Sequence, residues 1–399
     1  MEKKRKRICV VYQEDYPWDI RVEKIANVLS SEEHDVFIVC RNESRRIRDE
    51  DLNGIKIKRL PAVSKKFGKL NEVINFPAFF NPLWISAISD CVKNNKIDFI
   101  VVRDLPLALA AIAVGRFYKI PVFLDMAECY PELLRSLWKF GIFRFQNLVV
   151  RNPYFADVIE KIVIKRIDHI FVVVEEARER LIAKGADPRK VSIVSNTSPL
   201  AKFNPNLVVS KKDSGNKLKM IYVGYLTKGR GLTTPFEGLA LFIKDHKSPI
   251  SLCVVGTGEA EDDYKKLAKR LGIEEFIEFK GWVDNTKIAE YILSSDVGLV
   301  PHHVCGHWNN TVPNKLFDYM ACGIPVLSSN TRPVSRIIKE TGCGLVYKDL
   351  DPVDFRDCLI ELTNESKRMS FRENGRRAVQ EKYNWEIDSK SMVAIINTL

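Results

Sequence analysis

PNKLFDYMACGIPV, the run from Pro313 to Val326, is the most specific segment of this 399-residue chain. It leads into a strand candidate at residues 325–328, and another strand candidate at residues 297–300 precedes it. Strand candidates throughout the chain are continuous apolar runs, which are typical of parallel strands buried on both faces. The segment therefore belongs to a series of parallel strands separated by helices.

The same alternation extends outward from this segment over the whole chain. The second half also has strand candidates at residues 220–223, 251–255, 276–279 and 344–347, while the first half has them at residues 8–12, 35–40, 55–60, 98–103, 121–125, 169–174 and 191–195. Helical stretches such as residues 21–29 and 82–93 separate most of them. This pattern predicts an α/β fold with two Rossmann-like, doubly wound parallel-sheet domains that face each other across a cleft.

A polar, proline-containing stretch at residues 198–219 lies between the two series and indicates a linker. We therefore expect a first domain at residues 1–205 and a second at residues 217–384. The last helical piece, residues 385–399, is expected to pack back onto the first domain.

Composition excludes several classes of protein. An apolar share of 46% and a charged share of 28% are typical of a globular chain, and no apolar run approaches the length that spans a bilayer. The nine cysteines are scattered singly, which favours reduced structural thiols over disulfides. A crowded group of metal-ligating residue types lacks a recognised ligand spacing, so we expect no metal site there: His302, His303, Cys305 and His307.

The net charge of +11 predicts anionic partners. The chain has no DNA- or RNA-binding motif and its Lys and Arg residues are spread out, so we expect no nucleic-acid partner. The first strand candidate is followed by no glycine fingerprint, which excludes a classical dinucleotide dehydrogenase.

A glycine-rich loop opens the second domain, between a strand and a helix. In this loop, Gly224 to Gly231, glycines let the backbone approach a ligand, and Lys228 and Arg230 add cationic donors that suit a diphosphate. The alternative is an ordinary solvated turn. Gly256 begins a second glycine turn after the next strand, for which a tight connection is the alternative.

Taken together with Trp282 and the run from Pro313, these loops resemble the C-terminal domain of glycosyltransferase family 4, a group of retaining enzymes with the GT-B fold. In that family the run contains E-A-M-A-x-G-x-P-V, and its glutamate binds the donor ribose. Asp318 stands at that position here. Asn310 stands eight residues earlier, where the family has an acidic residue that contacts the donor sugar, and Tyr225 replaces a common arginine.

The first domain carries weaker similarity to the same family. Asp19 and Arg21 match a D-x-R-V motif near the acceptor side, and Glu128 matches the glutamate of D-x-H-E-x-x-P-E, with Ala127 in place of the histidine. Glu128 is then the candidate for orienting the acceptor hydroxyl or assisting its deprotonation. The alternative is a carboxylate that only complements a helix N-terminus.

The resemblance implies transfer of a hexosyl or N-acetylhexosaminyl group from a nucleotide-diphosphate sugar to a glycan or lipid-linked acceptor, with retention and without a metal or other cofactor. The expected catalytic residues are Glu128, Arg230 and Asn310. Expected donor-binding residues are Gly224, Lys228, Arg230, Gly256, Trp282, Asn310, Lys315 and Asp318, and expected acceptor-binding residues are Asp19, Arg21 and Glu128. For Lys315, a solvated surface lysine is the alternative.

The expected setting is surface polysaccharide synthesis in the cytoplasm. A basic and aromatic stretch at residues 133–166 and the basic N-terminal tail favour peripheral attachment to an anionic membrane surface, with core packing of those helices as the alternative. Three other functions stay open: a nucleotide-sugar epimerase, a sugar phosphorylase and a non-catalytic partner subunit.

Overall fold

The computed structural model describes residues 5–17, 19–62, 79–140, 151–203, 217–246 and 248–398. The chain forms two compact units. One comprises Met1–Leu134, Arg144–Val194 and Ser389–Leu399, and the other comprises Arg135–Phe143 and Ser195–Asp388. Residues 204–216 of the linker expected at residues 198–219, the start of the basic N-terminal tail and part of the basic-aromatic stretch lie outside the described residues.

The first unit contains an eight-stranded sheet in the order β3-β4-β2-β1-β5-β6-β7-β8. Its pairs are parallel except for β3–β4. The strands are β1 (Arg7–Asp15), β2 (Asp35–Arg41), β3 (Asp49–Leu52), β4 (Ile55–Arg59), β5 (Phe99–Arg103), β6 (Val122–Met126), β7 (His169–Val172) and β8 (Val191–Ile193). The helices are α1 (Ile20–Ser31), α3 (Pro82–Asn95), α4 (Ala108–Tyr118), α7 (Pro153–Ile164) and α8 (Glu175–Ala183). Helix α5 (Tyr130–Phe140) begins in this unit and clusters with the second from Arg135 on.

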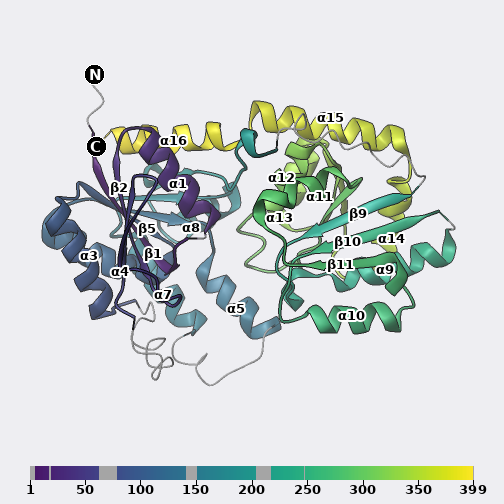
Figure 1. The fold of residues 1–399 in the computed structure, drawn as a ribbon, viewed down its shortest axis with the longest axis horizontal. Coiled ribbons are helices and arrows are strands. Elements are labelled where there is room, and N and C mark those ends of the chain that lie inside the picture. The colour runs from purple at the N-terminus through teal and green to yellow at the C-terminus, as the bar shows by residue number, and fades with distance from the viewer. Residues whose placement is uncertain are drawn as a thin grey trace. The chain divides into compact units, whose positions relative to one another are not determined.

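The second unit contains a six-stranded, fully parallel sheet in the order β11-β10-β9-β12-β13-β14. The strands are β9 (Leu218–Val223), β10 (Ile250–Val255), β11 (Ile277–Gly281), β12 (Val297–Val300), β13 (Val326–Ser329) and β14 (Gly344–Tyr347). The helices are α9 (Thr233–Asp245), α10 (Glu261–Arg270), α11 (Ile288–Leu293), α12 (Asn314–Cys322), α13 (Arg332–Thr341), α14 (Pro352–Glu361) and α15 (Glu365–Glu381). Helix α16 (Trp385–Asn397) begins in this unit, and its residues from Ser389 on cluster with the first unit, where the last helical piece was expected. Helices cover both faces of each sheet (Figure 1).

Local sequence explains where the helices begin and end. Asn81 and Asn152 cap α3 and α7 through their side-chain oxygens, and each is followed by a proline, whose missing N–H costs nothing at a first helical position. Gly323 ends α12 in the left-handed conformation, with φ of 64°. Large side chains then fill the space between helices and sheet, including Trp84, Phe99 and Phe171 in the first unit and Tyr222, Phe236 and Phe242 in the second.

The prediction of two doubly wound parallel sheets is confirmed, with two differences in detail. The antiparallel edge strand β3 was missed, because its sequence, DEDL, is too polar to resemble a buried strand. Residues 195–203, expected in the first domain, cluster with the second unit. There Ser198 accepts a backbone hydrogen bond from Trp385 and Thr197 donates to Asp388. Within the part of the chain that is described, no helix is both long and apolar enough to cross a membrane.

Candidate functional site

Two glycine loops meet at the carboxyl edge of the second sheet, where parallel sheets of this kind bind ligands. Gly224 donates its N–H to Val255, and Leu226 donates to Thr257, both at 2.9 Å. A Cβ atom on Gly256, which has φ of +133°, would overlap the carbonyl oxygen of Gly224. The need for glycine at position 256 therefore comes from loop-on-loop packing, which fits the tight connection given above as the alternative.

Lys315, at the start of α12, is a buried ammonium without a hydrogen-bond partner among the described residues. Its side chain is 7% exposed, and its Nζ lies 3.8 Å from the centre of the Tyr222 ring. A side chain at Gly224 would bring a Cβ within 3.0 Å of this Nζ, so the glycine also makes room for the ammonium. Burial, with the nearby Arg230 charge, lowers the pKa of Lys315 well below its ordinary value, and Asp318 partly opposes this effect. The alternative of a solvated surface lysine is thus wrong.

Arg230 is held in place by two aromatic side chains. Its Nη1 lies 2.9 Å from Nε2 of His302, and its guanidinium carbon lies 4.8 Å from the centre of the Trp308 ring. His302 is 1% exposed, and burial, followed by the charges of Lys315 and Arg230, lowers its pKa well below the ordinary value. A guanidinium can only donate, so neutral His302 accepts the bond at Nε2 and carries its own proton on Nδ1.

The ribose candidate Asp318 lies on α12, one turn after Lys315. Ser198 donates its hydroxyl to Oδ1 of Asp318. Asn310 lies in the loop before α12, and its Nδ2 donates to the carbonyl of Gly306 at 2.7 Å. One amide hydrogen of Asn310 is therefore used to hold its own loop.

The remaining donor-side candidates are exposed. Lys228 forms a surface ion pair of 3.3 Å with Asp263, and the Trp282 side chain is 74% exposed. The structure therefore gathers Gly224, Arg230, Lys315 and Asp318, whereas Lys228 and Trp282 face solvent.

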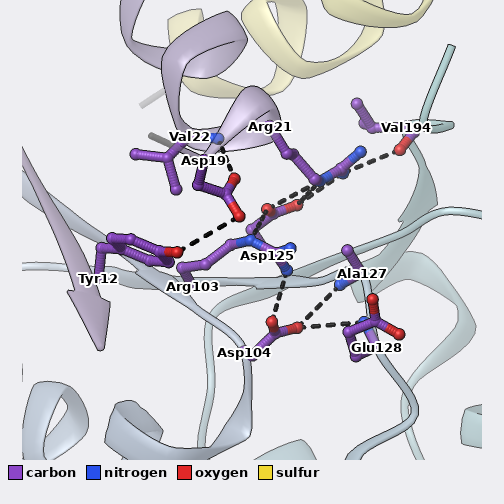
Figure 2. A network of polar contacts seen from close by, with 10 residues as sticks. All are labelled: Tyr12, Asp19, Arg21, Val22, Arg103, Asp104, Asp125, Ala127, Glu128 and Val194. Atoms are coloured by element: carbon purple, nitrogen blue, oxygen red, sulfur yellow. Dashed lines mark hydrogen bonds and ion pairs between the residues drawn. The ribbon is translucent and has the colours of Figure 1, made fainter. Parts of the chain in front are cut away.

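A buried ion pair crosses the carboxyl edge of the first sheet (Figure 2). Arg21 donates from Nε and Nη2 to both carboxylate oxygens of Asp125, at 2.6–3.0 Å, and Nη2 also donates to the carbonyl of Val194 at 2.9 Å. Arg21 is 2% exposed and Asp125 is 1% exposed. Burial alone would raise the pKa of Asp125, but the Arg21 guanidinium holds it below the ordinary value. Arg21, expected to contact the acceptor, is thus committed to an internal pair.

Asp19 and Glu128, the other acceptor-side candidates, lie beside this pair. Asp19 caps α1 by accepting from the N–H of Val22 at 2.8 Å, and its second oxygen lies 3.5 Å from the Tyr12 hydroxyl. Glu128, partly buried, follows β6, and its own N–H donates to Asp104. The structure therefore places all three acceptor-side candidates in one network (Figure 2).

Sequence reasoning missed several residues of these two edges. His302 was considered only as a metal ligand, while Trp308, Arg103 and Asp104 were not singled out. For Arg103, Asp104 and His302 the available signal was position, because polar or charged residues at or just after the carboxyl ends of the buried strands β5 and β12 reach the ligand-binding edge of a parallel sheet. Among the described residues, no group of three or more His, Cys, Asp or Glu side chains is placed to hold a metal ion.

The arrangement defines a two-unit α/β protein with a cationic, glycine-lined edge in its second unit. Residues 206–378 match the family "Glycosyl transferases group 1", and residues 19–197 match the "Glycosyl transferase 4-like domain". The chain therefore belongs to glycosyltransferase family 4, as the sequence predicted, and it is a glycosyltransferase of the GT-B type.

Known relatives agree with this assignment. An uncharacterised glycosyltransferase of Methanocaldococcus jannaschii is 25% identical over 391 residues, covering 96% of this chain and 94% of the relative. Sucrose-phosphate synthase from Thermosynechococcus elongatus superposes with a TM-score of 0.76 at 15% identity over 99% of both chains. HepE of Anabaena, solved in complex with UDP-glucose, gives 0.72 at 12% identity over 99% of this chain and all of the other. At these identities the two structures establish the fold alone.

Proposed function

We propose that this glycosyltransferase transfers a hexosyl or N-acetylhexosaminyl group, with retention, from a nucleoside-diphosphate sugar to a glycan or lipid-linked acceptor in surface polysaccharide synthesis. The observation that carries the proposal is the buried Lys315 ammonium, which has no hydrogen-bond acceptor among the described residues and lies close to a second cation, Arg230. Burying a cation is unfavourable unless an anion compensates it, and Asp318 offsets the burial of Lys315 only in part, so this edge is complementary to an anionic ligand. A diphosphate carries two negatively charged phosphate groups, which match the two cations Lys315 and Arg230.

The neighbouring residues support a nucleotide as the rest of that ligand. Asp318 is one helical turn from Lys315 and can accept hydrogen bonds from ribose hydroxyls once Ser198 shares or releases its carboxylate. Arg230 is oriented by His302 and Trp308, so little side-chain freedom remains to be lost when it binds phosphate. Gly224, Lys228, Gly256 and Trp282 complete the proposed donor site, with Asn310 toward the sugar.

In the proposed reaction, the bond from the anomeric carbon to the phosphate oxygen breaks and a bond to the acceptor oxygen forms on the same face. Negative charge builds on the leaving diphosphate, where Arg230 and Lys315 stabilise it. The acceptor proton passes to a phosphate oxygen, with Glu128 orienting the acceptor hydroxyl. The scheme requires neither a metal nor a pair of carboxylates at glycosidase spacing.

Calorimetric titration with UDP, GDP and ADP, and then with their sugars, tests the donor site. At least one nucleotide should bind, and Arg230→Ala should cut turnover severely in a folded protein, because the leaving charge loses its principal donor. Asp318→Ala should mainly weaken binding of the nucleotide sugar. A folded Arg230→Ala variant with near wild-type turnover would refute the assignment.

The stereochemistry has its own test. The anomeric configuration of the first product, read by proton NMR before mutarotation, should match that of the donor sugar. An inverted product would leave the donor site intact but remove the proposed retaining mechanism. Donor turnover without any acceptor would instead favour an epimerase, and a chain that binds no nucleotide sugar would favour a non-catalytic subunit.

A lipid-linked acceptor is supported by the outer face of α7. Tyr154, Phe155 and Val158 are 69%, 49% and 53% exposed, and the basic residues Lys161 and Lys165 continue the same face. Apolar side chains beside basic ones suit the interface of an anionic membrane. We therefore propose that this face attaches the enzyme peripherally to such a membrane.

Flotation with phosphatidylcholine vesicles, with and without phosphatidylglycerol, tests the attachment. The protein should float only with the anionic vesicles, and Phe155→Ser combined with Val158→Ser should reduce the bound fraction. Val353→Ser on α14, where Val353 is 48% exposed, is the matched control and should bind as wild type does. Equal binding by all three proteins would remove α7 from the proposal.

A further inference from the structure

The Ala127–Glu128 turn is held by a buried carboxylate, Asp104, that lies outside the family motifs quoted above. We propose that Asp104 is a positioning residue for sugar transfer: through one carboxylate oxygen it fixes the backbone of this turn, and thereby the place from which Glu128 meets the acceptor. The proposal rests on the acceptor role proposed for Glu128.

The two carboxylate oxygens of Asp104 have different partners (Figure 2). Its Oδ1 accepts from the N–H groups of both Ala127 and Glu128, each at 3.1 Å. Its Oδ2 forms an ion pair of 2.7 Å with Nη1 of Arg103. Its own N–H donates to the carbonyl of Asp125 at 2.9 Å. One side chain therefore joins the ends of β5 and β6.

The ion pair anchors Asp104 to the larger network. Arg103 Nε lies 3.7 Å from Oδ2 of Asp125, and both oxygens of this carboxylate accept hydrogen bonds from Arg21. Asp104 is 5% exposed, so these bonds are shielded from competing water. A turn tied to this chain of buried charges has little freedom to move.

The backbone of Asp104 supports a functional constraint. It has φ of 59° and ψ of 174°, a region that almost only glycine occupies without strain. A strained non-glycine residue persists only where its surroundings fix it, and such residues concentrate at active sites. Glycine would relieve the backbone strain at position 104, so the presence of aspartate points to a use for its side chain.

The test uses three variants with separate expectations. Asp104→Gly keeps the backbone conformation and removes the carboxylate, whereas Asp104→Asn keeps an oxygen that can accept from both N–H groups. Asp168→Asn is the matched control, because Asp168 accepts from the N–H of Val122 at the opposite end of β6. Acceptor kinetics, donor affinity and hydrogen exchange of the 124–133 segment would be measured for each.

We expect Asp104→Gly to lower kcat for transfer by roughly 10–100-fold, the effect of misplacing a reacting group by about 1 Å, with donor affinity unchanged. Asp104→Asn should lose roughly threefold or less, since the two N–H groups keep a neutral acceptor. In a Glu128→Gln background the loss from Asp104→Gly should largely disappear, because a positioning residue acts only through the residue it places.

Hydrogen exchange gives a readout that does not depend on activity. The 124–133 segment should exchange faster in Asp104→Gly but not in Asp104→Asn or Asp168→Asn. Unchanged hydrogen exchange in Asp104→Gly would overturn the positioning role. So would a double variant whose loss of kcat equals the product of the losses in Asp104→Gly and Glu128→Gln. If wild type binds no nucleotide sugar, the proposed function fails, and the exchange measurement alone decides the role of Asp104.

Discussion

The carboxyl edges of the two sheets handle buried charge in opposite ways. In the first unit, Arg21 and Arg103 are paired with Asp125 and Asp104. In the second, Lys315 has no hydrogen-bond partner within the described ranges, and the Arg230 contacts found there are a neutral histidine and a tryptophan ring. The buried charges of the first edge therefore compensate one another in ion pairs. The second is stable only at a cost that an anionic ligand would offset.

The largest loss of stability should come from breaking the buried Arg21–Asp125 ion pair of the first edge. Asp125→Asn removes the charge that compensates the buried Arg21 guanidinium, so the free energy of unfolding of the first unit should fall by about 3–5 kcal/mol. Denaturant unfolding followed by circular dichroism would measure this. The double replacement of Arg21 by Met and Asp125 by Leu leaves no uncompensated charge and should cost less. A single variant that loses under about 1 kcal/mol would show that water reaches the pair.

At the second edge, removing a buried charge is expected to increase the stability of the ligand-free protein. Lys315→Met removes a buried ammonium, so the ligand-free protein should gain about 0.5–2 kcal/mol of stability. The same change should weaken binding of the preferred nucleoside diphosphate by roughly 10–100-fold, the effect of losing a hydrogen bond to a charged group. Thermal shift and calorimetry would measure the two effects. Lys265→Met removes an exposed lysine paired with Glu261 and should change neither.

A pH series would sharpen the comparison at the first edge. Burial raises the pKa of Asp104 to about 7, with Arg103 opposing and Glu128 and Asp125 adding to the increase. Between about pH 4 and 7 the folded state then binds a proton that the unfolded state has lost, so stability falls as pH rises, by at most about 1.4 kcal/mol per pH unit.

Asp104→Asn should remove this contribution, which is seen as the difference between the two stability curves. The lowered pKa of His302 makes stability rise with pH, opposite to the effect of Asp104. Because both proteins contain His302, its contribution cancels when one stability curve is subtracted from the other. Parallel curves would mean that Asp104 is ionised throughout. Tyr12 on β1 and Tyr130 on α5 also lie near Asp104, but burial raises the pKa of both hydroxyls, so they stay protonated over this pH range.

The smallest expected effect is proton uptake on donor binding. The pKa of Lys315 is lowered in the free protein, and a bound diphosphate would raise it, so binding should take up a fraction of one proton at pH values between the free and bound pKa. Affinity should therefore decrease as pH rises through this range. Calorimetry in two buffers of different ionisation enthalpy would measure the uptake. Its persistence in Lys315→Met would assign the proton to another group, with His302 as the nearest candidate.

Sequence alone determined the parallel strands, the glycine loops and the residues that carry the family resemblance. These are local signals, because strand burial, turn chemistry and motif spacing depend on residues that are near each other along the chain. Asp318 and Arg230 were identified in this way, and the structure places both near Lys315.

Only the tertiary structure decided how charges are paired. Arg21 meets Asp125 from 104 positions away, and Ser198 meets Asp318 from 120 positions away. Lys315 is buried against Tyr222 on β9 and the Gly224 loop, and no local sequence pattern distinguishes this buried lysine from a solvated one. Electrostatic free energy depends on burial and on partners in space. The sequence therefore specified which charged groups are present, and the fold decided which of them are paired with opposite charges.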